Sequence, residues 1–241
     1  MHEPGDQYAE KVGLRAVLFD SGGVLIRPIG GRWNPRADFE QTVLAADPSV
    51  TPERFAAGIE AGERFFARCA STPDFDDYHR AVLAGLGVAA TAELLAELVR
   101  PVPASSVLET FAEVPGTLAE LRRRGVRMAV VSDAWADLPD LHTELGIGEY
   151  FEAYAISQLL GCNKPDPRTY RHASTALGLE PDRCLFIDDD PALVAAAIEL
   201  GYAGLAMRRD PLAEDGEGGR VGFIRSLTEI LALFPPGSAE T

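Results

Sequence analysis

Short apolar runs recur along the chain and alternate with segments whose apolar residues are spaced as on one face of a helix. A continuous apolar run of about four to eight residues is typical of a strand that is buried on both faces of a parallel sheet. Five runs fit this description: 15–19, 127–131, 153–156, 184–187 and 201–207. Helices that end in a glycine are predicted at 115–124, 167–177 and 192–200. This alternation predicts a doubly wound α/β fold with a parallel, Rossmann-like sheet.

The interval between the first two runs breaks the alternation. No strand is predicted from 29 to 105, and amphipathic stretches at 52–69, 75–86 and 91–98 occupy it instead. Such an interval is too long for a loop, and segments rich in Pro, Gly and Ser flank it. We therefore expect an α/β core domain formed by residues 1–28 and 106–241, with a small helical domain, residues 29–105, inserted into it.

Composition narrows the possible partners and the compartment. The net charge of −15 argues against nucleic acid or an anionic membrane as a partner, because both require basic patches. No apolar run approaches the roughly 20 residues that span a bilayer, and the polar, acidic N-terminus does not resemble a signal peptide. Three widely spaced cysteines suggest neither a disulfide framework nor a zinc site. A cytoplasmic protein is expected, and the sequence leaves its oligomeric state, monomer or dimer, open.

Polar residues collect where the predicted strands end. Asp20 follows the first strand, Ser132 and Asp133 follow the second, and three aspartates, residues 188–190, follow the fourth. The carboxyl ends of parallel strands lie at one edge of the sheet, where ligands bind. Each acid taken alone is equally explained as a strand-end or helix-capping residue. Together they would repel one another unless a cation neutralised them, and hard oxygen ligands suit Mg²⁺.

Lysine is rare in this chain, which makes one lysine informative. Of the 22 basic residues only Lys11 and Lys164 are lysines. Lys164 lies in the segment GCNKPDP, just before a predicted helix. A compact ammonium can hold a phosphate and a carboxylate together without bidentate geometry. Although a lone lysine is usually a solvated charge, a role in the site is predicted here.

Four segments in this order resemble the motifs of the haloacid dehalogenase-like hydrolase superfamily, in the subgroup with a helical cap inserted after the first motif. They are VLFDSGGVL, AVVSDA, NKPDP and LFIDDDPALVAAA. The resemblance implies that Asp20 attacks phosphorus and forms an aspartyl-phosphate, that Ser132 binds phosphoryl oxygens, and that Lys164 offsets their charge. It also implies a Mg²⁺ site. Asp189 would be its main acid, and Asp20 and the backbone carbonyl of Gly22 would join it. Asp188 would either be a further ligand or support the ligands without contacting the metal.

Substrate contacts are predicted in both the core and the insert. Ser132, Asp133 and Lys164 would contact the substrate from the core. Arg32 and Trp33, in the entry to the insert, would clamp an anion or cover a ring, although packing of the hinge explains them equally well. The resemblance implies that the substrate is a small phosphorylated metabolite.

Gly22 and Leu193 depart from the family pattern. Most phosphatases of this superfamily have an aspartate, the general acid/base, at the position of Gly22, and often a further Asp or Asn at that of Leu193. Loss of a general acid typically lowers a rate by about 10² to 10⁴. A substrate with a good leaving group, such as an anomeric sugar phosphate or an acyl phosphate, would need less protonation. Otherwise His79 of the insert, or water, would supply the proton.

Two other functions remain open from the sequence. A carbon–halogen hydrolase of the same fold would need no proton for its leaving halide, but its fourth motif would lack the acidic metal site. A weakly catalytic or regulatory phosphate-binding protein would explain Gly22 and Leu193, but not the retained Asp20, Ser132, Lys164 and Asp189. A Mg²⁺-dependent phosphatase, with a sugar phosphate favoured by Gly22, is therefore the predicted function.

Overall fold

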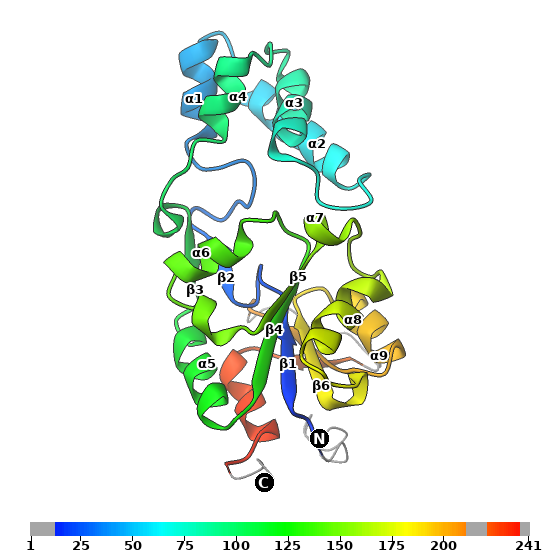
Figure 1. Ribbon diagram of the computed structural model, residues 1–241. Helices are drawn as coiled ribbons and strands as arrows, with labels where there is room; N and C mark the ends of the chain where they lie inside the picture. The colour runs from blue at the N-terminus through cyan, green and yellow to red at the C-terminus, as the bar shows by residue number, and fades with distance from the viewer. Residues whose placement is uncertain (1–12, 211–220, 237–241) are drawn as a thin grey trace. The chain divides into compact units, whose positions relative to one another are not determined.

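The computed structural model describes residues 13–210 and 221–236, and the chain divides into two compact units (Figure 1). One unit comprises Met1–Arg27 and Thr110–Thr241, and the other comprises Pro28–Glu109. The sequence placed the inserted segment at 29–105. No helix among the described residues is long and apolar enough to cross a membrane.

A six-stranded parallel sheet forms the centre of the larger unit. Its strand order is β5-β4-β1-β6-β7-β8, and Phe19 of β1 pairs with Val130 of β4 on one side and Ile187 of β6 on the other. All five predicted strands are present, and their ends lie within two residues of the predicted ones, so the α/β fold class is confirmed. The sixth strand, β8, was not predicted. The strands are β1 (Ala16–Phe19), β4 (Arg127–Ser132), β5 (Ala153–Ile156), β6 (Cys184–Asp188), β7 (Ala203–Met207) and β8 (Gly222–Ile224).

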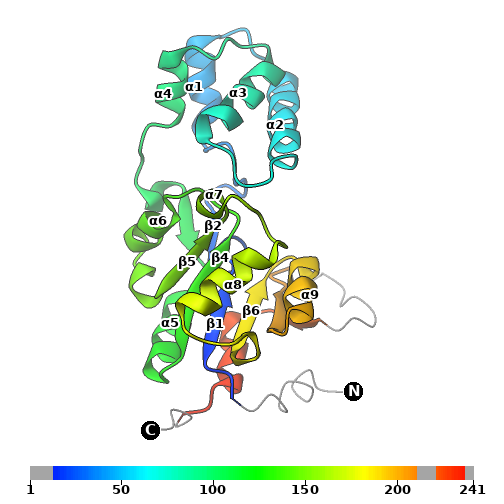
Figure 2. The same cartoon turned by 45° about the vertical axis from the view of Figure 1, so that its right-hand side comes forward.

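Helices cover both faces of this sheet (Figures 1 and 2). Ala16 and Leu18 of β1 belong to a buried cluster with Tyr170 of α8 and Val194 of α9, which places these two helices on one face. The helices α5 and η4 lie on the other face. Because β1 is covered on both faces, its four residues are all fully buried. The helical segments are α5 (Val114–Arg123), α6 (Leu138–Glu144), η2 (Gly148–Tyr150), α7 (Ser157–Leu160), α8 (Pro167–Ala176), η3 (Pro181–Arg183), α9 (Pro191–Glu199) and η4 (Leu227–Leu233).

The inserted unit is helical, as its amphipathic stretches predicted. Helices α2 and α3 pack closely at glycines: a Cβ on Gly58 would lie 2.6 Å from the Leu86 side chain, and one on Gly85 would lie 2.7 Å from Ala61. Its helices are α1 (Phe39–Ala46), α2 (Pro52–Phe66), α3 (Phe75–Leu86), α4 (Ala92–Leu98) and η1 (Ala104–Ser106). A two-stranded sheet of β2 (Ile26–Pro28) and β3 (Leu108–Thr110) lies where the chain passes between the units.

Two details of the insert differ from the prediction. Helix α1 was not predicted, and α2 ends at Phe66 instead of extending to residue 69. The N–H of Arg68 bonds to the Phe65 carbonyl at 3.1 Å and that of Cys69 to the Phe66 carbonyl at 3.0 Å. These bonds span three residues instead of four, so the chain leaves the α-helix in a tighter turn.

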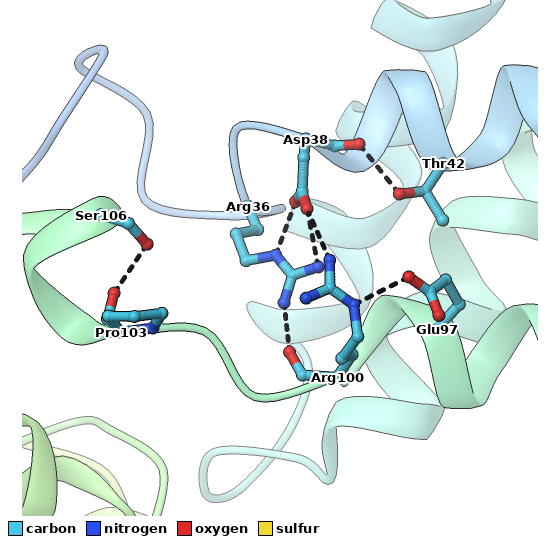
Figure 3. Close-up of polar contacts among 7 residues, drawn as sticks. All are labelled: Arg36, Asp38, Thr42, Glu97, Arg100, Pro103 and Ser106. Atoms are coloured by element: carbon cyan, nitrogen blue, oxygen red, sulfur yellow. Dashed lines mark hydrogen bonds and ion pairs between the residues drawn. The ribbon is translucent and has the colours of Figure 1, made fainter.

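The entry and exit segments of the insert are joined by a network of arginines (Figure 3). Arg36 donates from Nε to Asp38 Oδ1 at 2.6 Å and from Nη1 to the carbonyl of Arg100. Arg100 in turn donates to Glu97 at 2.8 Å. Arg36 therefore holds together two segments that lie 64 residues apart in the sequence.

Candidate active site

The strand order places the predicted site at the reversal point of the sheet. From β1 the chain builds outward through β4 and β5 on one side and through β6, β7 and β8 on the other. The crevice at the carboxyl ends of the strands, where the order reverses, is the usual ligand site of such folds. Asp20 directly follows β1, Ser132 ends β4 and Asp188 ends β6, so the residues predicted from three segments meet at this edge.

Lys164 links two of these acids. Its Nζ donates to Asp20 Oδ1 at 2.8 Å and to Asp188 Oδ2 at 2.6 Å. All three residues are buried, and Asp188 is only 1% exposed. Charge-assisted hydrogen bonds of this length in a poorly solvated site are strong and directional. Both carboxylates raise the pKa of Lys164 despite its burial, so the lysine is a fixed positive charge between them.

Asp189 completes an acidic cluster. Carboxylate oxygens of Asp20, Asp188 and Asp189 all lie within 4.8 Å of one another. Burial, with the Asp188 charge added to it, raises the pKa of Asp189 to about 6. Burial also raises the pKa of Asp20, against the opposing effect of Lys164. The ammonium of Lys164 can offset only one of the three carboxylate charges. The atoms available to bind a metal are carboxylate oxygens, the hard ligands that Mg²⁺ prefers, so these residues fit a Mg²⁺ ion.

The neighbouring acids of the same motifs have structural partners. Asp133 Oδ1 accepts a hydrogen bond from the backbone N–H of Lys164 at 3.0 Å and so holds the loop that carries the lysine. Asp190 caps α9, since its Oδ1 accepts from the N–H of Ala192 at 2.8 Å. Its own N–H donates to Asp188 Oδ1 at 2.9 Å. Of the three consecutive aspartates, two therefore belong to the cluster and the third fixes the helix behind it.

A buried histidine next to the predicted nucleophile was missed by sequence reasoning. His142 of α6 shares a hydrogen bond with Ser21 Oγ at 2.8 Å through Nε2, and with the Tyr154 hydroxyl at 3.2 Å through Nδ1. Burial lowers the pKa of His142 to about 4, so the ring is neutral at pH 7. The contact fixes Ser21, the residue after Asp20. The sequence around either residue does not indicate this contact, because Ser21 and His142 are 121 residues apart in the chain.

Comparison with known proteins identifies the family. A sequence model described as haloacid dehalogenase-like hydrolase matches residues 14–201. The chain belongs to this family. It is 33% identical to a phosphoserine phosphatase of Thermus thermophilus over 131 residues, which cover 51% of this chain and 51% of that protein. The chain thus spans about half the length of that relative. The chain is also 26% identical to a phosphatase of Mycobacterium tuberculosis, over 92% of this chain and 97% of that protein.

The fold of this haloacid dehalogenase-like hydrolase also matches solved structures. The L-2-haloacid dehalogenase of Xanthobacter autotrophicus superposes with a TM-score of 0.64 at 17% identity, covering 91% of this chain and 98% of that one. The resemblance seen in the four motifs is thereby confirmed at the level of family and fold. Phosphatases and dehalogenases both occur among the similar proteins, so the comparisons establish a hydrolase family without selecting its reaction.

The predicted substrate contacts of the insert lie in the second compact unit of this haloacid dehalogenase-like hydrolase. Arg32 pairs with Glu40 at 3.2 Å, which takes up part of its charge. Trp33 is 47% exposed, more than is usual for so large an apolar side chain. Their roles in substrate binding stay predictions.

His79 is not suited to donate a proton. Its ring is buried in the insert and lies nearly parallel to the rings of Phe39, at a centroid distance of 6.2 Å, and Phe75, at 6.3 Å. Burial lowers its pKa to about 4, so at pH 7 the imidazole carries no proton to give as an acid. The possibility that His79 replaces the missing aspartate is therefore set aside, and its role is to fill the core of the insert.

Because His79 is buried in its neutral form, we expect the folded protein to lose stability in acid. In the unfolded chain a histidine has a pKa of about 6.5. Its contribution to stability is present above that pH and lost as the pH falls toward the folded value of about 4. His79→Phe keeps an aromatic ring in the stack and removes the titration. Urea unfolding followed by circular dichroism measures the free energy of unfolding. Between pH 6.5 and 4 the wild type should lose up to about 3 kcal/mol more of it than the variant does.

The exposed His172 of α8 supplies the control for this experiment. His172→Gln should leave the pH dependence of unfolding as in the wild type. Equal slopes for the wild type and His79→Phe would show that His79 does not contribute to acid sensitivity.

Proposed function

We propose that this haloacid dehalogenase-like hydrolase is a Mg²⁺-dependent phosphomonoesterase that works through an aspartyl-phosphate on Asp20. The observation that carries the proposal is the shared ammonium. Lys164 Nζ donates to Asp20 and Asp188 at once, and Asp189 completes a cluster that still carries excess negative charge. Such a cluster is suited to a divalent cation and, with it, to a phosphate dianion. The substrate is a small phosphorylated metabolite.

In the first step Asp20 Oδ2, the oxygen not bonded to Lys164, attacks phosphorus. The bond between phosphorus and the leaving oxygen breaks, and the electron pair stays on that oxygen, which is protonated from water. In the second step water attacks phosphorus, the bond from phosphorus to Asp20 breaks and its electron pair returns to the carboxylate. The phosphate leaves with one proton of that water, and the hydroxide left from the first step takes the other. Lys164 holds Asp20 in place throughout, and the Ser132 hydroxyl donates a hydrogen bond to a phosphoryl oxygen. Asp20, Asp188, Asp189 and the Gly22 carbonyl would hold Mg²⁺, which would supply positive charge for the phosphoryl oxygens.

Gly22 constrains the leaving group. It offers no proton, and the neutral His79 offers none in its place. A leaving group that departs readily as an anion suits this site, which favours an anomeric sugar phosphate over a simple alkyl phosphate.

Restoring the acid tests this part of the proposal. The φ angle of Gly22 is not positive, whereas that of Gly23 is +70°, so the backbone conformation at residue 22 does not require glycine. Gly22→Asp should raise kcat/KM for a simple alkyl phosphate by about 10² to 10⁴, and that for a glycosyl 1-phosphate by much less. Gly22→Asn has the same shape without the proton and should raise neither. Equal gains for both substrates would contradict a leaving-group limit.

A haloacid dehalogenase is the second candidate, favoured by Gly22 because a leaving halide needs no proton. Against it stands the charge of the site. Without a cation, the carboxylates of Asp188 and Asp189 would repel both the carboxylate of a haloacid and the departing halide.

One screen separates the candidates. Phosphorylated metabolites and 2-haloacids are offered to the protein with Mg²⁺ and with a chelator, and released phosphate and halide are measured. The proposal expects phosphate release that requires Mg²⁺. Halide release without phosphate release would establish the dehalogenase. Neither activity, combined with thermal stabilisation by inorganic phosphate, would establish a binding protein.

A further inference from the structure

Residues 21–25, which follow the predicted nucleophile, form a turn that carries the Gly22 carbonyl. The Ser21 carbonyl accepts from the N–H groups of Leu25 at 2.9 Å and Ile26 at 3.0 Å, and the N–H of Gly23 donates to the Ile26 carbonyl. These bonds give the turn its local shape. They leave the carbonyls of Gly23 and Val24 available to partners from elsewhere in the chain.

Arg209, just after β7, binds both of these carbonyls. Its Nε donates to the Gly23 carbonyl at 3.0 Å and its Nη2 to the Val24 carbonyl at 2.5 Å. The two donors belong to one rigid, planar fork, so they fix the position of two successive peptide groups together. A lysine in this place has a single ammonium and lacks that geometry.

The guanidinium of Arg209 is itself held from two directions. Nη1 pairs with Glu113 Oε1 at 2.5 Å, and Cζ lies 3.5 Å from the centroid of the Phe111 ring. The Arg209 side chain is only 18% exposed, so solvent screens these contacts less than it screens a surface pair. The fork therefore connects the 21–25 turn to the segment that leads into α5.

The turn lies directly against the acidic cluster. A Cβ placed on Gly23 would lie 2.2 Å from Asp189 Oδ2 and 2.7 Å from its Cγ. Only a glycine allows so close an approach, and the positive φ of +70° at this residue also favours glycine. Any shift of the Gly23 backbone consequently changes the room left for the Asp189 carboxylate and moves the neighbouring Gly22 carbonyl.

We propose that Arg209 is a positioning residue for the divalent-cation site, because its fork fixes the 21–25 turn and thereby the spacing between the Gly22 carbonyl and the Asp189 carboxylate. The inference rests on the Mg²⁺ dependence in the proposed function. It assigns a part of the metal affinity to Arg209, which lies outside the four motifs and acts on the cluster of Asp20, Asp188 and Asp189 only through the turn. Residues that orient metal ligands in this indirect way typically contribute about 10- to 100-fold in metal affinity.

Mg²⁺ binding, measured by isothermal titration calorimetry on the full chain without substrate, tests this. Arg209→Gln should weaken Mg²⁺ binding by at least about tenfold, and Arg209→Lys should also weaken it because one ammonium cannot replace the fork. Glu113→Gln leaves the fork in place but removes its anchor, and should give a smaller loss. This second variant tests the inference even if Arg209→Gln does not fold.

Arg208 provides a matched control. It is the neighbouring residue, and its guanidinium also lies over an aromatic ring, 3.8 Å from the centroid of Phe223. Arg208→Gln makes the same chemical change and should leave Mg²⁺ affinity as in the wild type. Unchanged affinity in folded Arg209→Gln or Glu113→Gln, or an equal loss in Arg208→Gln, would overturn the inference while the proposed function stands. Absence of Mg²⁺ binding by the wild type would overturn the inference together with the metal dependence of the proposed function.

Discussion

Asp20→Asn is expected to lower phosphate release by more than about 10⁴-fold, the scale of loss when a covalent nucleophile is removed. Asn retains the size of the side chain and can still accept a hydrogen bond from Lys164, which donates to Asp20 at 2.8 Å in the wild type. It provides no carboxylate to attack phosphorus. Initial rates of phosphate release at saturating Mg²⁺ measure the effect. Acid quenching followed by intact-mass analysis should detect a phosphoryl adduct in the wild type and none in the variant.

Asp182→Asn is a suitable control for this loss. Asp182 is exposed in η3, and the ion pair that it forms with Arg183 is long at 3.8 Å. The same chemical change at that position should leave turnover unaltered. Phosphate release by Asp20→Asn at the wild-type rate would refute the assignment of the nucleophile.

Lys164→Met is expected to destabilise the fold by about 3–5 kcal/mol, because removing one partner of a buried ion pair leaves the others uncompensated. Asp20 and Asp188 would both lose their counter-ion, and both are buried. The pKa of Asp20, which burial already raises, would rise further in the folded variant once the opposing effect of Lys164 is removed. The loss of stability should therefore grow as the pH rises from about 4 through neutrality. Urea unfolding at pH 5 and pH 8, without divalent cations, measures the size of the destabilisation and the direction in which it changes with pH.

A double variant separates charge from packing in this experiment. Lys164→Met combined with Asp188→Asn removes one of the two orphaned charges and should recover part of the stability lost at pH 8. If the single variant is as stable as the wild type at pH 8, the buried ammonium is not what balances the cluster. If the double variant recovers nothing, lost packing around the lysine explains the destabilisation instead.

The doubly wound core could be predicted because its signals are local. Each central strand is a short apolar run covered on both faces, and each helix of the core that was predicted has its apolar residues on one face and a glycine after its end. Helices α5, α8 and α9 begin and end within one residue of the predicted positions. The short elements α1, α6 and β8 were missed. Their stability comes from packing against the rest of their unit, and a few residues give too short a window for periodicity to be recognised.

The residues of the candidate site could be predicted for a related reason. Asp20, Ser132 and the 188–190 aspartates each stand at the end of a recognisable strand, and parallel strands bring their carboxyl ends to one edge. Lys164 was distinguished by the rarity of lysine in the chain. The same reasoning could not separate the three consecutive aspartates, since a cluster acid and a helix cap look alike in sequence. Their hydrogen bonds in the folded chain distinguish them. Asp190 accepts from the N–H of Ala192 and caps the helix, whereas Asp188 accepts from the ammonium of Lys164 and belongs to the cluster.

By itself, then, the sequence determined the sheet and the acids and lysine at its edge, because strand periodicity and strand ends depend on neighbours along the chain. Tertiary structure decided how that edge is supported. Ser21 meets His142 across 121 residues, and Gly23 meets Arg209 across 186. It also decided that His79 is a neutral core residue, since burial in the insert beside Phe39 and Phe75, and not its place in the sequence, sets its pKa. Contacts of this kind follow from the packing of whole elements, which brings together side chains whose own sequence surroundings carry no trace of the partner.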